Sequence, residues 1–163
     1  MAFDAKSLNT PDRMIVGGGG VALIASFLPW WGYSGPLGLY GSSVSGWNAG
    51  FTAWAGSLLL AAAAVYLVLH RSGVSLPSLP VGPSVAIAGA AVVGLALVVI
   101  RWLSLPRVHA GLAGNVGPKF GLWLALAAGT VEVVGAVMAF RASGESLPWA
   151  APGSNEPEDE IQR

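Results

Sequence analysis

Four long apolar stretches, separated by shorter polar or glycine-rich segments, dominate the pattern of this chain. They cover residues 14–31, 48–69, 83–103 and 120–140. An α-helix rises about 1.5 Å per residue, so a stretch of about 20 residues crosses a hydrocarbon core of ~30 Å. Because each backbone amide in lipid has to be paired within its own segment, we expect four transmembrane helices.

The connections predict how these helices are arranged. The connection over residues 71–82 is short and contains the turn-forming residues Gly73, Pro77 and Pro80. This favours antiparallel packing of the second and third helices. Residues 32–47 carry no charge and contain aromatics, which favours a loop that folds back onto the helices, with a partner surface as the alternative. We therefore predict an all-α membrane protein, with four transmembrane helices in an antiparallel up-down bundle and a structured outer loop between helices 1 and 2.

Three segments follow from this division of the chain. Residues 1–13 are a cytoplasmic N-terminal segment, residues 14–140 the transmembrane domain, and residues 141–163 a disordered acidic C-terminal tail. Thr10 is the expected N-cap of the first helix, with Pro11 at its first helical position. A basic residue before an apolar run also fits a signal peptide, but Leu28-Pro29-Trp30-Trp31 lacks the small residues of a cleavage site, so we expect a retained span.

Basic residues near the ends of the stretches predict the orientation. With both termini in the cytoplasm, the inner side holds Lys6, Arg13, Arg71, Arg141 and Arg163, and the outer side Arg101, Arg107 and Lys119. This excess favours a multi-pass protein of the plasma membrane with both termini cytoplasmic. Indole rings prefer the headgroup boundary. On the outer side we predict an interfacial aromatic belt of Trp30, Trp31, Trp47, Trp54, Trp102 and Trp123.

Small residues recur at four-residue spacing in two of the stretches. Such spacing lets helix backbones approach closely in lipid, either within one chain or between copies. The predicted helix-packing residues are Gly121, Ala125 and Gly129 in the fourth stretch and Ala86, Ala90 and Gly94 in the third.

Glu132 is the only acidic residue inside a predicted span. At about 1.5 Å per residue it lies about 18 Å from the start of its helix, near the middle of the bilayer. An ionised carboxylate there costs about 2.5–3.5 kcal/mol on the insertion scale for Asp, so it calls for a partner or a neutralising proton. We expect it to face a helix contact, because its helical neighbours are small: Ala128, Gly129, Gly135 and Ala136.

Two interpretations of this candidate intramembrane polar site stay open. Glu132 is either a proton or cation site, or a protonated group that gives one hydrogen bond to Ser57, Thr130 or a backbone carbonyl. Arg101 is the candidate partner, but it lies about two residues from the outer end of its stretch. The depth difference of about 14 Å exceeds the combined reach of about 10 Å, so we expect Arg101 to extend toward the outer headgroups.

Composition and motifs exclude most activities. The chain is 54% hydrophobic and 10% charged, against about 25% charged in soluble domains, and its mean hydropathy is +0.65. It has no cysteine, which excludes disulfides, thiolate ligands and a cysteine nucleophile. His70 and His109 fall on opposite sides and cannot share a metal or haem. We therefore expect no enzyme, no metal and no cofactor.

Two motifs resemble those of small four-span membrane proteins of high-GC actinobacteria. Phe27-Leu28-Pro29-Trp30 is similar to their Phe-x-Pro-Trp, and Gly117-Pro118-Lys119-Phe120-Gly121-Leu122-Trp123 to their entry to span four. The resemblance covers about residues 10–142 and implies four spans but no activity. The layout is also loosely similar to the claudin group, although Gly38-Leu39-Tyr40 stands where that group has Gly-Leu-Trp and its cysteine pair is missing.

From these features we predict a structural or accessory component of a membrane assembly. Its partners are the lipid bilayer and either another membrane protein or further copies of itself, with no nucleic acid. The alternative function is a proton- or ion-conducting homo-oligomer that uses Glu132.

Overall fold

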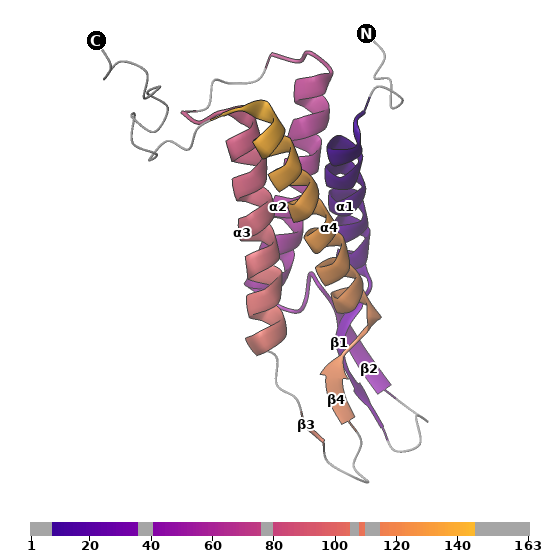
Figure 1. The fold of residues 1–163 in the computed structure, drawn as a ribbon. Helices are drawn as coiled ribbons and strands as arrows, with labels where there is room; N and C mark the ends of the chain where they lie inside the picture. The colour runs from indigo at the N-terminus through magenta and orange to yellow at the C-terminus, as the bar shows by residue number, and fades with distance from the viewer. Residues whose placement is uncertain (1–7, 36–40, 76–79, 105–107, 110–114, 146–163) are drawn as a thin grey trace, which may run out of the picture.

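The computed structural model describes residues 8–35, 41–75, 80–104, 108–109 and 115–145 (Figure 1). This part of the chain is mostly helical. Its helices are α1 (Thr10–Phe27), α2 (Phe51–Arg71), α3 (Pro83–Ser104) and α4 (Phe120–Ser143). They run up and down along one elongated bundle, in which α1 packs against both α2 and α4 and α3 packs against α2 and α4.

Three of these helices, α2, α3 and α4, are long and apolar enough to cross a membrane by length and composition. Helix α1 differs because its 18 residues include Asp12, Arg13 and the four glycines Gly17 to Gly20, which lower its mean hydropathy. Its length of 18 residues still corresponds to about 27 Å of helix. The finding agrees with the predicted membrane class for three of the four stretches.

A small antiparallel sheet covers one end of the bundle, which we call the sheet end. It consists of β1 (Pro29–Ser34), β2 (Gly41–Ser45), β3 (Val108–His109) and β4 (Asn115–Pro118), in the order β2-β1-β4-β3. Strand β1 pairs with β4 through Trp31 opposite Pro118 and Gly32 opposite Gly117, so the sheet joins the two connections at this end. The predicted helical fold is therefore confirmed in part, and the all-α class is corrected by this sheet. Pairing with a distant segment satisfies backbone groups that a loop would leave to water.

The ends of α1 differ from the predicted ones. The N-cap is Asn9 rather than Thr10, because the Asn9 side chain accepts a hydrogen bond of 2.9 Å from the backbone N–H of Asp12. The helix stops at Phe27, since the residue before Pro29 is disfavoured in helical conformation. Trp30 and Trp31 consequently belong to β1. At the other end of the chain, α4 continues to Ser143, past the predicted start of the tail, and residues 146–163 lie outside the described residues.

Glycines set how closely the helices approach one another. A Cβ atom added to Gly18 would lie 2.7 Å from the Ala128 carbonyl oxygen of α4, and one added to Gly56 would lie 2.8 Å from the Gly94 carbonyl oxygen of α3. Helices α1 and α4, and helices α2 and α3, therefore touch backbone to backbone. Such contacts replace the hydrophobic driving force that helices lack in lipid.

The predicted packing residues fall in two groups. Gly121, Ala125 and Gly129 are all buried on α4, as is Gly94 on α3. Ala86 and Ala90 are only half-buried. The buried stripe of α3 is instead formed by Ile87, Ala91, Gly94 and Val98.

Candidate functional site

Glu132 lies in the middle of α4 and is fully buried. The four small residues around it on α4, named above, are buried with it. Helix α1 presents two glycines to the same side chain. A Cβ added to Gly18 would lie 2.7 Å from the Glu132 Cβ, and one added to Gly19 would lie 3.3 Å from its Oε1. The carboxyl group is therefore held between α4 and the glycine-rich turn of α1.

Neither carboxyl oxygen of Glu132 has a hydrogen-bond partner among the described residues. The two hydroxyl groups expected nearby are engaged elsewhere: Ser57 donates to the Ala53 carbonyl at 3.0 Å, and Thr130 to the Leu126 carbonyl at 2.8 Å. An ion in such a place needs a compensating charge, and even a neutral polar group there is costly. The described residues thus leave both carboxyl oxygens of Glu132 without a hydrogen-bond donor.

Arg101 does not meet Glu132 in the described part of the chain. It lies in the last turn of α3, at the sheet end, where its guanidinium group packs beside Gly50. A Cβ added to Gly50 would lie 3.3 Å from Arg101 Cζ, and Gly50 has the positive φ of 117° that glycine tolerates. The structure therefore separates the two residues of the predicted polar site, as their difference in depth suggested.

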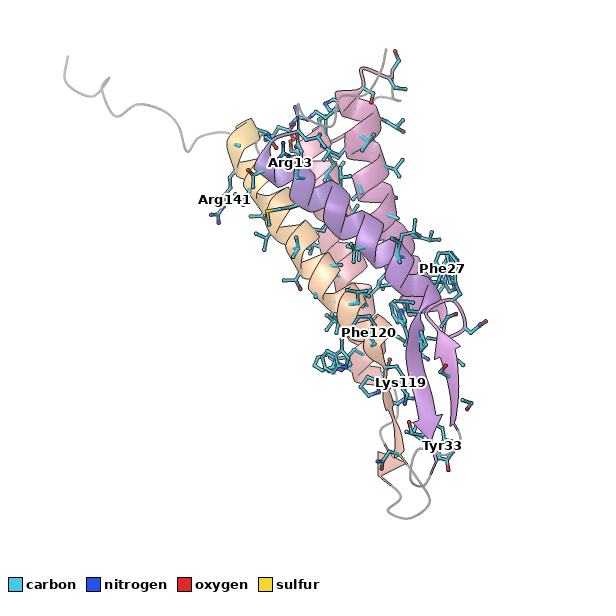
Figure 2. All side chains as sticks on the ribbon, turned by 90° about the vertical axis from the view of Figure 1, so that its right-hand side faces the viewer. Arg13, Phe27, Tyr33, Lys119, Phe120 and Arg141 are labelled. Carbon is cyan, nitrogen blue, oxygen red and sulfur yellow. The ribbon has the colours of Figure 1, made fainter. Side chains whose placement is uncertain are left out.

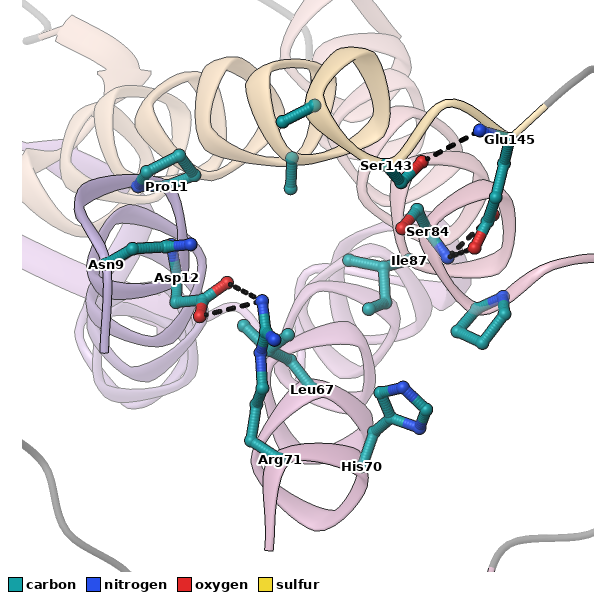
Figure 3. A pocket seen from close by; sticks show the side chains of 13 residues that line it. Asn9, Pro11, Asp12, Leu67, His70, Arg71, Ser84, Ile87, Ser143 and Glu145 are labelled. Carbon is teal, nitrogen blue, oxygen red and sulfur yellow. Dashed lines mark hydrogen bonds and ion pairs between the residues drawn. The ribbon is translucent and has the colours of Figure 1, made fainter. Parts of the chain in front are cut away.

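A second polar cluster, which sequence reasoning missed, lies at the bundle end opposite the sheet. There Arg71 of α2 forms an ion pair of 3.0 Å with Asp12 of α1, whose side chain is 3% exposed. Glu145 accepts hydrogen bonds of 3.1 and 3.2 Å from the backbone N–H groups of Ser84 and Val85, which begin α3. Figure 3 shows the two interactions on opposite sides of an opening between the helices. The Asp12–Arg71 ion pair joins α1 to α2, and the hydrogen bonds of Glu145 join the end of α4 to α3. The second interaction also places a carboxylate at the N-terminus of α3.

Between these interactions lies a cavity of about 330 Å³, which we call the polar cavity (Figure 3). All four helices line it, and Leu67, Ile87 and Ala139 are its apolar residues farthest into the bundle. Ala139 is two helical turns from Glu132 along α4, a separation of about 10 Å. The polar cavity therefore approaches Glu132 from the end opposite the sheet.

Leu60 of α2 lies beside Gly129, on the side of Glu132 that faces the sheet end. Its side chain is fully buried at the centre of the bundle. Gly129 lies one turn nearer the sheet end than Glu132, and a Cβ added to it would lie 3.2 Å from Leu60 Cδ1. A Cβ added to Gly94 would lie 3.0 Å from Leu60 Cγ.

The tryptophans of the predicted belt have two different environments. Trp30 is fully buried, and its indole N–H donates to the Ala25 carbonyl at 2.7 Å, while Trp31 is 8% exposed. These two pack within the protein because they lie in the central strand. The other four, Trp47, Trp54, Trp102 and Trp123, are partly or largely exposed near the sheet end. Exposed phenylalanines accompany them, and Figure 2 shows Phe27 and Phe120 at this level of the bundle.

Histidine offers no further site in the described residues. His70 is exposed at the end of α2 with its ring stacked on Tyr66, at a centroid distance of 6.3 Å. The side chain of His109 lies outside the described residues. Within the described ranges, no three His, Cys, Asp or Glu residues gather in a way that could hold a metal ion.

Comparison of the chain with protein families, with curated proteins and with solved structures gives no match. Function therefore has to follow from the geometry of this bundle.

Proposed function

We propose that the chain is a four-span integral membrane protein of the plasma membrane, in which α1 is the fourth span and both termini are cytoplasmic. Helix α1 lies alongside the three apolar helices, so a bilayer that contains them also surrounds α1 (Figure 1). The exposed tryptophans and phenylalanines at the sheet end suit an outer headgroup boundary. Arg13 and Arg141 lie at the opposite end (Figure 2), where basic residues favour the cytoplasm.

Single cysteines test this topology without a background signal, because the chain has none. Thr10 and Ser43 are both exposed, at opposite ends of α1 and its connected hairpin. We expect a membrane-impermeant maleimide to label Ser43→Cys in intact cells and Thr10→Cys only after permeabilisation. Labelling of both residues from the same side would refute the fourth span.

We further propose that Glu132 is a proton- or cation-binding site, reached from the cytoplasm through the polar cavity. The observation that carries this is a fully buried carboxyl group whose two oxygens have no partner among the described residues. Leaving a polar group buried and unpaired costs about 1–3 kcal/mol, and more when it is ionised. A bound proton or cation neutralises the negative charge of the Glu132 carboxylate. Because the polar cavity ends about two helical turns from the buried carboxyl group, a proton or cation has to pass Leu67, Ile87 and Ala139 to reach it.

The test is infrared spectroscopy of the protein in lipid, followed by flux into liposomes. The chain has other carboxyl groups, so the signal is the difference between the bands of protonated carboxylic acids in the variants. The wild type and Thr130→Val, a control on the exposed side of α4, are expected to share a pH-dependent component that is missing from Glu132→Gln. Identical carboxylic-acid bands in the wild type and Glu132→Gln at every pH would refute the site. Proton flux that is lost only in Glu132→Gln would then extend binding to conduction.

A second function, a structural or accessory component of a membrane assembly, is favoured by strand β2. It lies at the edge of the sheet, is exposed and carries no charge, with Val44 40% exposed. An open, uncharged edge can pair with a strand of another protein. Mild extraction followed by intact-mass measurement should then recover a stoichiometric partner or oligomer. Val44→Lys should lose it while Val44→Thr keeps it, and a wild type that is always a single chain would contradict this function.

A further inference from the structure

An apolar groove of about 240 Å³ runs along the outside of the bundle between α1 and α2. One stripe of α1, from Val16 to Leu23, forms one side, and a facing stripe of α2, from Ala61 to Leu69, forms the other. Its residues Gly20 and Val65 are exposed on the surface that faces lipid in the proposed topology. We call it the lateral groove.

One residue of the groove wall, Gly19, lies beside the carboxyl group of Glu132. Gly19 and Ala64 both line the groove. A Cβ added to Gly19 would lie 2.6 Å from the Ala64 Cβ and 3.3 Å from Glu132 Oε1. The unpartnered carboxyl group therefore lies directly behind the groove wall, beside a residue of α1 that has no side chain.

We propose that the lateral groove seats an amphipathic organic monocation, of the class of protonated alkylamines, with its chain in the groove and its ammonium group on Glu132. This inference rests on the proposed role of Glu132 as a proton or cation site and adds the class of substrate. The lining is apolar and suits an alkyl chain, which gains about 25 cal/mol for each Å² removed from water. A small parting of α1 and α2 at Gly19 brings the ammonium group to the carboxylate.

Charge complementarity selects a cation of one charge. Glu132 supplies one carboxylate, and no charged side chain is among the residues that line the groove. A lipid acyl chain can cover the groove, but it leaves the carboxyl group unpaired. When the cation binds to protonated Glu132, the O–H bond breaks, the proton leaves to water and the carboxylate pairs with the ammonium. One proton is thus released for each cation bound.

The probes are 1-octylamine, which is protonated at neutral pH because alkylamines titrate near a pKa of about 10, and 1-octanol, its neutral counterpart. Binding and proton release are measured with the full-length protein in weakly buffered nanodiscs, against empty nanodiscs. We expect octylamine to bind with release of a proton, and Glu132→Gln to weaken this binding by about tenfold or more. Octanol should bind equally to the wild type and to Glu132→Gln, and more weakly than octylamine to the wild type.

Two glycines provide a matched pair of groove variants. A Cβ added to Gly17 or to Gly20 meets nothing within 4 Å, so neither substitution disturbs the packing at that atom. Gly20 lines the groove and Gly17 does not. Gly20→Leu is therefore expected to weaken octylamine binding as Glu132→Gln does, and Gly17→Leu to leave it unchanged.

Three results would overturn the inference. Equal binding of octanol and octylamine to the wild type would show a groove that takes any alkyl chain. Equal effects of Gly17→Leu and Gly20→Leu would place the amine elsewhere. A wild type that shows the titrating infrared band of Glu132 but binds no octylamine would refute the substrate class while the proton site stands, whereas absence of that band refutes both proposals.

Discussion

Gly18→Ala tests the backbone contact between α1 and α4 that holds the Glu132 site together. The added Cβ would lie 2.7 Å from the Ala128 carbonyl oxygen and 2.9 Å from the Glu132 backbone nitrogen. Both are backbone atoms of α4, so no side-chain rotation relieves the overlap. The two helices have to separate by several tenths of an ångström to restore ordinary contact.

Gly17→Ala is the control that isolates the cost of this separation. It adds the same methyl group one residue earlier in α1, where nothing lies within 4 Å. Both substitutions gain the same helix propensity, about 1 kcal/mol for alanine over glycine. Only Gly18→Ala overpacks the interface, which costs about 1–3 kcal/mol. We therefore expect Gly18→Ala to be less stable than Gly17→Ala by about 1–3 kcal/mol.

The assay is reversible unfolding of the purified protein in mixed micelles with increasing dodecyl sulfate, followed by circular dichroism. The midpoint should shift to lower dodecyl sulfate for Gly18→Ala than for Gly17→Ala. If the two variants unfold at the same midpoint, α1 does not lie against α4 at Gly18, and the enclosure of Glu132 by α1 is refuted with it.

Three further substitutions test the ends of the bundle in the same unfolding assay. Asp12→Asn removes the ion pair with Arg71 and should lower the free energy of unfolding by about 1 kcal/mol. The loss is this small because half-exposed Arg71 can regain water. In a protein that already carries Arg71→Gln, the same substitution should cost less or even stabilise. Trp30→Phe keeps an aromatic ring but removes the indole N–H bond, so a loss of about 1 kcal/mol is expected, and unchanged stability would contradict a structural role for that bond. Glu145→Gln removes the negative charge at the start of α3 and should cost about 0.5–1 kcal/mol at low salt. This last loss should fade at high salt, and a salt-independent loss would speak against an electrostatic cause.

The helices could be predicted closely because hydrophobicity and length are local properties of the sequence. The predicted stretch 83–103 differs from α3 by one residue at its end, and α4 begins at the predicted Phe120. The first stretch extended too far, because Pro29 and the tryptophans after it are apolar without being helical. The apolar character of this segment correctly indicates burial, since Trp30 is fully buried. It does not distinguish burial in a strand from burial in a helix.

The sheet could not be predicted from either connection alone. Strand β1 contains Pro29 and Gly32, which are both uncommon in central strands, and its partner β4 begins at Asn115, far along the chain. The two strands meet because antiparallel helices bring both connections to the same end of the bundle. Long-range pairing of this kind leaves no periodic signal in so short a segment.

The surroundings of Glu132 on its own helix followed from helical spacing, but its approach routes did not. The polar cavity requires the ends of all four helices to meet, and the sequence signals for it were single residues: Asp12 in a first turn, Arg71 in a last turn, and Glu145 just after α4. Each is ordinary for a helix end. Only the fold shows that they surround one opening.

The polar cavity, the lateral groove and Leu60 lie on different sides of Glu132, so one carboxyl group would serve both the proposed proton route and the proposed amine route. The polar cavity ends two turns from Glu132, the lateral groove ends at Gly19 beside it, and Leu60 lies beyond it toward the sheet. A proton from the cavity and an organic cation from the lipid would then compete for the same oxygens, so occupation by one excludes the other. Release toward the sheet end requires Leu60 to move. Its side chain packs closely against Gly94 and Gly129, so such a movement requires α3 or α4 to shift with it.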